Sequence, residues 1–407
     1  MKRLLAAMLA ALTVFSTAGC AKPDNSTEPV TPDQQVEPAP TVPQEPVLTP
    51  EEQAEQERLA AEQARTQRLQ ALLDSMTLEE KVGQLFFVRC PTENAVEDIS
   101  TYHLGGYLLF GRDFKDGDNW LTKEQFLEKI QSYQDVAEIP LFIGSDEEGG
   151  TVTRASRNPN LFSEPFKSPQ AIYSAGGMEA LAQDALDKSQ SLLDLGINVN
   201  FAPVCDVSTD PGDFIYDRTL GQDAETTADY ITRTVLTMGD AGEMAVLKHF
   251  PGYGNNADTH TGIAVDDRPM ETFENSDLLP FKAGIEADAP FVLVSHNIVS
   301  CMDPDLPASL SPAVHKVLRE ECGFDGIAIT DDLAMDAVQA YAKDGAVAVM
   351  ALQAGNDMVI TTDYRTQIPA VIEAVKNGTL EESVIDSACF RVLKCKDAHM
   401  YIPALDS

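Results

Sequence analysis

The sequence predicts an α/β fold, a single (β/α)8 TIM-like barrel over residues 75–407. Short runs of β-branched, aliphatic and aromatic residues alternate eight times with helical stretches in this part of the chain. Most of the runs are continuously apolar, which is typical of parallel strands buried on both faces. Eight strand-helix units in series favour closure into a barrel. No shift in composition after residue 75 marks a second domain.

The expected strands are four or five residues long. In chain order they are residues 85–88, 106–110, 141–144, 199–202, 245–248, 291–295, 326–330 and 357–360. Helical patterns between them include residues 223–241, 274–286 and 312–321. Thr77 and Glu80 stand three residues apart, the spacing of a capping box that starts a helix.

The first residues predict export. Lys2 and Arg3 precede an apolar run over residues 4–17, and the small residues 18–19 are followed by Cys20. This pattern indicates a signal peptide, residues 1–19. Cys20 directly after Ala-Gly resembles the lipobox of bacterial lipoproteins, which implies lipidation of Cys20 and a membrane lipoprotein facing the envelope or exterior. The alternative is an ordinary signal peptide with a coincidental cysteine.

A tether and a helix lead into the barrel. Residues 20–50 contain eight prolines among polar residues, and a segment so poor in apolar residues is expected to stay extended and disordered. Residues 51–74 are rich in Ala, Glu, Gln, Arg and Leu and predict a connecting helix. Its apolar residues are few, so we expect a solvated helix, with a short coiled coil as the alternative.

Charge and cysteine content exclude several classes. The formal net charge of −36 argues against nucleic-acid binding, which requires clustered Lys and Arg. The seven cysteines form no CxxC pair, so a zinc ribbon or thioredoxin motif is not expected. We expect mostly reduced, buried cysteines, and we expect a monomer that uses no cofactor and no metal.

Polar residues cluster where five of the expected strands end. These clusters are residues 145–150, 203–206, 248–249, 295–297 and 331–332. A single cluster could be a helix cap. In a parallel barrel, however, all of these strand ends meet at one rim, where the active site lies. The pattern therefore predicts one site at the barrel mouth.

Several motifs stand out in the barrel region. The most specific is KHFPGYG at residues 248–254, followed by DTH at 258–260. The others are VLR at 317–319 with GFDGIAITD at 323–331, DEEGG at 146–150 with Arg154, and YDRTLG at 216–221. Together these motifs resemble glycoside hydrolase family 3, in its β-N-acetylglucosaminidase (NagZ-like) branch. Ala328 and Thr151 depart from the family pattern.

The resemblance implies a retaining, exo-acting β-N-acetylhexosaminidase that acts on cell-wall-derived or chitin-like oligosaccharides. Asp331 takes the place of the nucleophile, and it suits the role because it ends a buried strand. Its neighbour Asp332 is the competing candidate, or else a cap of the next helix. His260 takes the place of the acid/base, and Asp258 can orient its imidazole and favour its protonated form.

The resemblance also implies a set of sugar-binding residues. The alternative is that these residues form salt bridges between barrel loops. They are Asp146, Arg154, Arg218, Lys248 and His249. His296 ends a strand, but the sequence assigns it no role.

Other functions stay open. The same scaffold could serve a β-N-acetylglucosaminide phosphorylase, because a neutral imidazole does not repel phosphate, or a β-glucosidase. A sugar-binding lipoprotein without activity is the alternative from another class. A metal hydrolase using His249, Asp258 and His260 is conceivable, although no HExxH-like spacing supports it.

Overall fold

The computed structural model describes residues 48–256, 264–335, 338, 341 and 347–405. Contacts divide the chain into two units, Met1–Glu55 and Gln56–Ser407. The elements below lie in the second unit, apart from the start of the first helix. The expected signal peptide, the expected lipidation site Cys20 and most of the expected tether lie outside the described residues.

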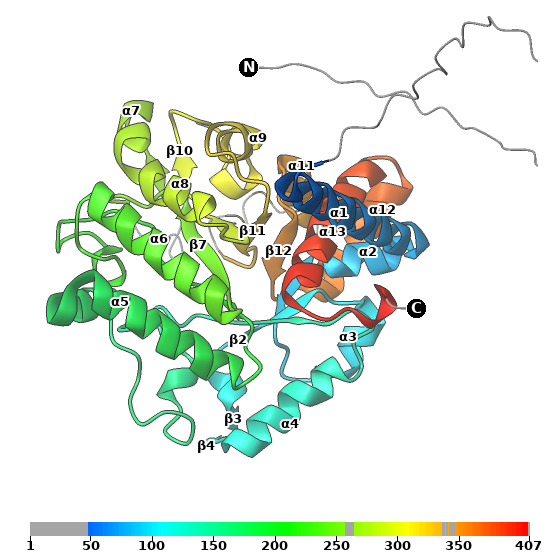
Figure 1. The fold of residues 1–407 in the computed structure, drawn as a ribbon, viewed down its shortest axis with the longest axis horizontal. Helices are drawn as coiled ribbons and strands as arrows, with labels where there is room; N and C mark the ends of the chain where they lie inside the picture. The colour runs from blue at the N-terminus through cyan, green and yellow to red at the C-terminus, as the bar shows by residue number, and fades with distance from the viewer. Residues whose placement is uncertain (1–47, 257–263, 336–337, 339–340, 342–346, 406–407) are drawn as a thin grey trace, which may run out of the picture. The chain divides into compact units, whose positions relative to one another are not determined.

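Eight parallel strands form a closed barrel, in which each strand pairs with its neighbours in chain order and the last pairs with the first (Figure 1). They are β1 (Phe86–Arg89), β2 (Gly106–Leu109), β5 (Phe142–Ser145), β6 (Val199–Asn200), β7 (Met244–Phe250), β9 (Phe291–Val294), β11 (Ile327–Asp332) and β12 (Met358–Thr361). The barrel closes where Phe87 of β1 lies opposite Ile360 of β12. The predicted fold class is therefore confirmed, and the strand ends differ from the expected ones by up to two residues.

Two pairs of short strands lie outside the barrel. β3 (Lys115–Asp116) pairs antiparallel with β4 (Asn119–Trp120). β8 (Val265–Asp266) pairs parallel with β10 (Ile298–Val299).

Helices surround the barrel on its outside (Figure 1). The α-helices are α1 (Pro50–Ser75), α2 (Leu78–Gln84), α3 (Glu97–Tyr102), α4 (Lys123–Gln134), α5 (Pro169–Leu193), α6 (Ala224–Ala241), α7 (Met270–Thr272), α8 (Leu278–Glu286), α9 (Pro312–Lys316), α11 (Val347–Ala354), α12 (Tyr364–Lys376) and α13 (Glu382–His399). The 3-10 helices are η1 (Gly111–Phe114), η2 (Ala155–Arg157), η3 (Tyr216–Arg218), η6 (Ala308–Leu310) and η8 (Pro403–Leu405). No helix in the described part of the chain is long and apolar enough to span a membrane.

Helix ends follow their sequence signals in some places and not in others. Thr77 and Glu80 form the expected capping box at the start of α2. Two expected helices, however, contain π-helical turns, η5 (Phe273–Asp277) before α8 and η7 (Val317–Glu321) after α9. The apolar spacing of a helix does not distinguish such turns from α-helix.

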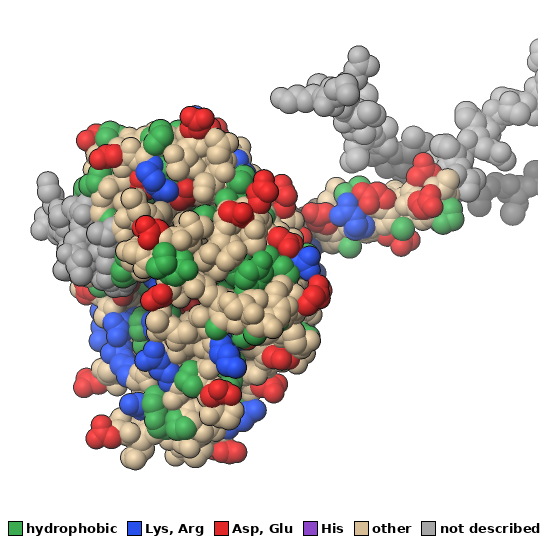
Figure 2. All heavy atoms as spheres, turned by 90° about the vertical axis from the view of Figure 1, so that its left-hand side faces the viewer, with side chains coloured by type: hydrophobic (Ala, Val, Ile, Leu, Met, Phe, Trp, Pro, Cys, Tyr) green, Lys and Arg blue, Asp and Glu red, His purple; other side chains and the backbone are tan. Residues whose placement is uncertain are grey.

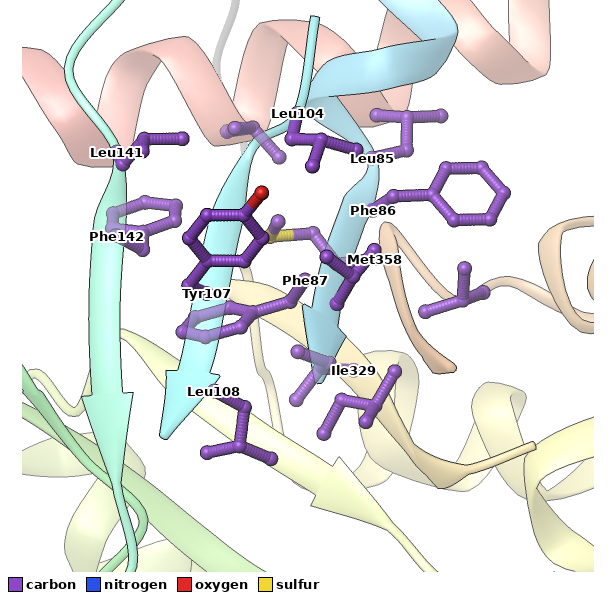
Figure 3. Packing of buried hydrophobic residues seen from close by; sticks show 14 of the residues in the cluster. Leu85, Phe86, Phe87, Leu104, Tyr107, Leu108, Leu141, Phe142, Ile329 and Met358 are labelled. Atoms are coloured by element: carbon purple, nitrogen blue, oxygen red, sulfur yellow. The ribbon is translucent and has the colours of Figure 1, made fainter. Parts of the chain in front are cut away.

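Aromatic rings pack on one another in the interior of the barrel, and two of them, Phe87 and Phe142, are labelled in Figure 3. Phe142 of β5 meets Phe291 of β9 edge to face at 5.3 Å, although these strands are not neighbours, so the contact crosses the interior. Phe87 of β1 stacks on Phe142 at 6.0 Å and meets Phe201 edge to face at 5.3 Å. A Cβ atom at Gly144 would lie 2.7 Å from the Phe87 and Phe201 rings, so only glycine fits there. This packing keeps the strand ends at fixed positions.

The connecting helix corrects one expectation. Most of α1 is exposed, as expected for a solvated helix, but Leu69 and Leu73 are buried in the main hydrophobic core. Arg65 of α1 also forms an ion pair with Asp397 of α13. The last turns of α1 therefore pack on the barrel domain, because two leucines four residues apart share one helix face.

The described cysteines are unpaired, as expected, and the surface displays the excess of acidic residues in the sequence. The six cysteines in the described ranges are free thiols, and four of them are buried. Burial raises the pKa of the Cys90 thiol to about 12, which leaves it protonated and unreactive. Acidic side chains are spread over the face drawn in Figure 2, and several basic side chains gather in one region of it while others lie scattered.

Candidate active site

Side chains from the carboxyl ends of several barrel strands line one cavity of about 390 Å³. Six predicted site residues line it together: Asp146, Arg154, Arg218, Lys248, His249 and Asp331. They come from loops or strand ends after β5, β6, β7 and β11, as the rim position of the polar clusters predicts. Asp258 and His260, the other two predicted residues, lie outside the described residues.

Lys248 is the central cation of the cavity. It belongs to β7, and its side chain is 3% exposed. Its ammonium group lies 2.9 Å from Asp146 Oδ1 and 2.5 Å from Glu148 Oε1. Asp146 also accepts a hydrogen bond from Arg154 Nη2 at 3.2 Å. The Asp146 carboxylate is thus held between two cations at the cavity wall.

Glu148 fixes the position of Arg218. Arg218 donates two hydrogen bonds to this carboxylate, at 2.7 and 2.9 Å, in the bidentate geometry that orients a guanidinium group. Burial opposes ionisation of Glu148, but the charges of Arg218 and Lys248 outweigh it and hold the pKa of the carboxyl well below its usual range. Glu148 therefore remains an anion beneath the cavity.

His249 has a defined tautomer. Its Nε2 lies 2.9 Å from Arg218 Nη2, and because a guanidinium group can only donate, Nε2 is the acceptor and carries no proton. The proton is on Nδ1, which donates to Asp206 Oδ2 at 2.7 Å. The other oxygen of Asp206 accepts a hydrogen bond from the backbone N–H of Tyr253 at 2.7 Å. Asp206 thus fixes both the imidazole and the chain that follows it.

The two adjacent aspartates at the end of β11 have different environments. Asp332 accepts hydrogen bonds from the Ala334 N–H at 2.9 Å and the Thr362 hydroxyl at 3.2 Å. Asp331 accepts one from the Asp332 N–H at 2.8 Å. Burial raises the pKa of Asp332, which disfavours its charged form. Asp332 is thus bound into the turn after the strand.

His296 supports the same strand end. Its Nε2 lies 3.1 Å from the carbonyl oxygen of Asp332 and donates to it, so Nδ1 accepts a hydrogen bond from the Ser309 hydroxyl at 2.7 Å. The ring is fully buried. No role was expected for His296 from the sequence, and the structure shows that it fixes the backbone beside Asp331.

The sequence prediction missed several residues of the site. Arg89, the last residue of β1, lines the cavity with its guanidinium group 4.1 Å from the centre of the Phe110 ring. Arg154 approaches the same ring at 5.4 Å. The position of Arg89 at a strand end was a signal that could have found it. Glu148 and Asp206 stand within the polar clusters, but their sequence positions do not reveal their ion-pair partners.

The described residues offer one candidate group of metal ligands. Within these ranges, Glu80, His103 and Glu138 are the three His, Cys, Asp or Glu side chains close enough to share an ion. They line a different cavity.

The arrangement of the candidate site fits a small ring with many hydroxyl groups, because fixed carboxylates accept and fixed cations donate hydrogen bonds around one space.

Comparison with known proteins agrees with this geometry. A family profile described as "Glycosyl hydrolase family 3 N terminal domain" matches residues 77–395. Beta-hexosaminidase LpqI of Mycobacterium tuberculosis is 30% identical over 330 residues, which cover 78% of this chain and 82% of that protein. A beta-hexosaminidase of Xylella fastidiosa is 31% identical over 261 residues, covering 63% and 76% of the two chains.

Solved structures are similar over the same region. A glycoside hydrolase family 3 beta-N-acetylglucosaminidase from Paenibacillus superposes with a TM-score of 0.73 and 30% identity, covering 82% of this chain and 64% of that chain. A beta-N-acetylhexosaminidase from Beutenbergia cavernae gives a TM-score of 0.70 at 30% identity, covering 79% and 99%. The chain therefore belongs to glycosyl hydrolase family 3 and is a glycoside hydrolase.

Proposed function

We propose that this protein is an exo-acting β-N-acetylglucosaminidase that removes terminal N-acetylglucosamine from oligosaccharides with retention of configuration. One observation carries the proposal: Asp331, at the end of a buried strand, lines the same cavity as the fixed Asp146–Lys248–Arg154 group. The relatives are a β-hexosaminidase and a β-N-acetylglucosaminidase, which supports the choice of substrate.

The sugar-binding residues act through hydrogen bonds. The Asp146 carboxylate accepts from ring hydroxyls, while Lys248 and Arg154 donate to hydroxyl or acetamido oxygens. His249 and Arg218 form the neighbouring wall, and because Asp206 and Glu148 fix their orientation, the cavity is preorganised for the sugar.

Catalysis takes two steps. An Asp331 oxygen attacks the anomeric carbon, the bond from that carbon to the leaving oxygen breaks, and the His260 imidazolium protonates this oxygen. Water then attacks the anomeric carbon of the glycosyl ester, His260 takes its proton, and the Asp331 carboxylate leaves. Asp258 acts on the His260 imidazole by orienting it and favouring its charged form.

Release of p-nitrophenol from p-nitrophenyl N-acetylglucosaminide tests the proposed activity. His260→Ala should reduce turnover of substrates with poor leaving groups far more than turnover of this one, because a good leaving group needs little protonation. Equal losses on both kinds of substrate would contradict the role of His260. An aryl glucoside without the 2-acetamido group separates this activity from that of a β-glucosidase.

Phosphorolysis is the second candidate, and one observation favours it. The Nε atoms of Arg89 and Arg154, whose guanidinium groups both lie near the Phe110 ring, are buried and have no hydrogen-bond partner among the described residues. Two such donors suit an anion. Phosphorolysis predicts a sugar 1-phosphate in phosphate buffer, and free sugar as the sole product would exclude it.

We also propose export and anchoring through a lipid on Cys20, with action on cell-wall-derived or chitin-like oligosaccharides as a monomer. The leader pattern of residues 1–20 supports export and lipidation. Mass spectrometry of the mature N-terminus tests both. A mature chain that begins at another residue, or at an unmodified Cys20, would contradict the anchor.

A further inference from the structure

The loop between β6 and α6 is anchored in the cavity at two points. Near its start, Asp206 binds the His249 imidazole, and near its end Arg218 binds Glu148. Residues 206–221, here called the β6–α6 loop, therefore run from one wall of the candidate site out to its rim and back. Within this loop, Arg218 is the residue for which the family resemblance implies a role.

Hydrogen bonds within the β6–α6 loop hold its outer part in one shape. The Ser208 hydroxyl donates to Asp213 Oδ2 at 2.7 Å, and the Gly212 N–H donates to Asp210 Oδ1 at 2.8 Å. The Tyr216 N–H donates to the carbonyl oxygen of Asp213 at 3.2 Å. A side chain on this part of the loop is consequently presented in a fixed position.

That side chain is Phe214, and its ring is not buried by the fold. Phe214 is 43% exposed, whereas the large fully buried side chains of the chain include seven other phenylalanines of the barrel strands and helices: Phe86, Phe87, Phe126, Phe142, Phe250, Phe281 and Phe291. Leaving an aromatic ring of this size in water forgoes its burial energy. A rigid loop that presents such a ring beside an active-site cavity indicates a contact made by the ligand.

A row of rings connects Phe214 with the cavity. The Phe214 ring lies 5.9 Å from the Tyr253 ring, and the Tyr253 ring meets the His249 imidazole edge on at 5.4 Å. Tyr253 and His249 both line the cavity. Phe214 is thus the outermost of three rings that begin at the sugar-binding wall and end at the solvent.

We propose that Phe214 forms an aglycone subsite that binds the pyranose ring on the leaving-group side of the scissile bond. The C–H groups on one face of a pyranose are apolar and pack on an aromatic ring, while its hydroxyls remain free to hydrogen-bond at the rim. This inference rests on the proposed function and assigns it a preference for aglycones that contain a second sugar.

The test compares two substrates with different leaving groups. One is methyl β-N-acetylglucosaminide, whose aglycone has no ring, and the other is the β-1,4-linked disaccharide of N-acetylglucosamine. The full-length protein and its Phe214→Ala variant are assayed for released N-acetylglucosamine on both. Phe214→Ala should lower kcat/KM on the disaccharide about tenfold and leave the methyl glycoside unchanged.

Two further variants separate the ring from general apolar bulk. Phe214→Trp should keep the disaccharide preference, and Phe214→Leu should lose it. Leu236→Ala, which truncates an exposed leucine on α6, serves as the matched control and should change neither rate.

Each outcome bears on one claim. A ratio of the two kcat/KM values that stays the same in Phe214→Ala, including an equal loss on both substrates, would overturn the subsite. Failure of the unmodified protein to hydrolyse the methyl glycoside and p-nitrophenyl N-acetylglucosaminide would instead overturn the proposed function.

Discussion

Nδ1 of His249 donates a hydrogen bond of 2.7 Å to Oδ2 of Asp206, and this contact leaves Nε2 free to accept from Arg218. Asp206→Asn should disturb it, because the side-chain amide of asparagine can donate to Nδ1 and thereby move the ring proton to Nε2. Two donors, Nε2–H and Arg218 Nη2–H, would then face each other. We expect kcat/KM to fall about 10- to 100-fold, as for other groups that orient a functional histidine.

Steady-state kinetics on the aryl N-acetylglucosaminide measures this effect, and nitrogen NMR of the histidine ring reports the tautomer. Asp210→Asn, on the same loop but away from His249, is the matched control. Unchanged kinetics together with an unchanged tautomer in Asp206→Asn would show that Asp206 does not set the protonation of the ring.

Glu243 should make stability depend on pH. The side chain is 1% exposed, and burial raises its pKa from 4.5 to about 7, although the Ser189 hydroxyl donates to it at 2.7 Å. Between these two values the folded state binds more protons than the unfolded state, so the free energy of unfolding falls as the pH rises from about 4.5 to 7. The loss is at most about 3 kcal/mol.

Glu243→Gln removes the titrating group and should flatten this part of the curve. Urea unfolding of both proteins at pH 5 and pH 8 measures it. The variant should lose less stability than the unmodified protein between the two pH values. A parallel decline in both would mean that Glu243 is ionised in the folded state throughout.

Arg268 should be important for stability because it neutralises two buried carboxylates. It contacts Asp266 at 2.8 Å and Asp277 at 3.0 Å, and both carboxylates are 1% exposed. Burial raises the pKa of Asp277 to about 6, even with the opposing charge of Arg268 beside it. Arg268→Ala should lower the free energy of unfolding by about 3–5 kcal/mol at pH 8.

The loss in Arg268→Ala should be smaller at pH 5, where Asp277 is protonated and no longer requires a cation. Denaturant unfolding at the two pH values tests this difference. Arg233→Ala removes an arginine whose side chain is 41% exposed and pairs with Asp229 and Glu179, and it should cost less than about 1 kcal/mol. Equal losses from the two substitutions would contradict the importance of burial.

The barrel could be predicted from the sequence because each strand is identified from its own consecutive residues. A continuous apolar run such as 291–295 identifies a buried strand without knowledge of its partners. The burial of Leu69 and Leu73 was missed because α1 as a whole has few apolar residues. Its composition therefore does not show that its last turns contact the core while the rest of the helix is exposed. The π-helical turns were missed for a similar reason, since their residues share the spacing of an α-helix.

For the candidate site too, some features could be predicted from the sequence and others could not. The rim position of Asp146, Lys248 and Asp331 followed from their places at strand ends, which is a property of the topology. The pairing of Glu148 with Arg218 joins residues from two different loops, and only the folded chain brings them within 2.7 Å. Phe214 was missed because an exposed aromatic ring in a polar loop has no signature of its own in the sequence.

The most direct test of the account compares Asp331→Asn with Asp332→Asn in turnover of the aryl N-acetylglucosaminide. If Asp331 is the nucleophile, Asp331→Asn should lower kcat about 10³-fold or more, while Asp332→Asn, which alters a turn contact, should retain substantial activity. Near-normal turnover in Asp331→Asn, or the larger loss in Asp332→Asn, would contradict the account.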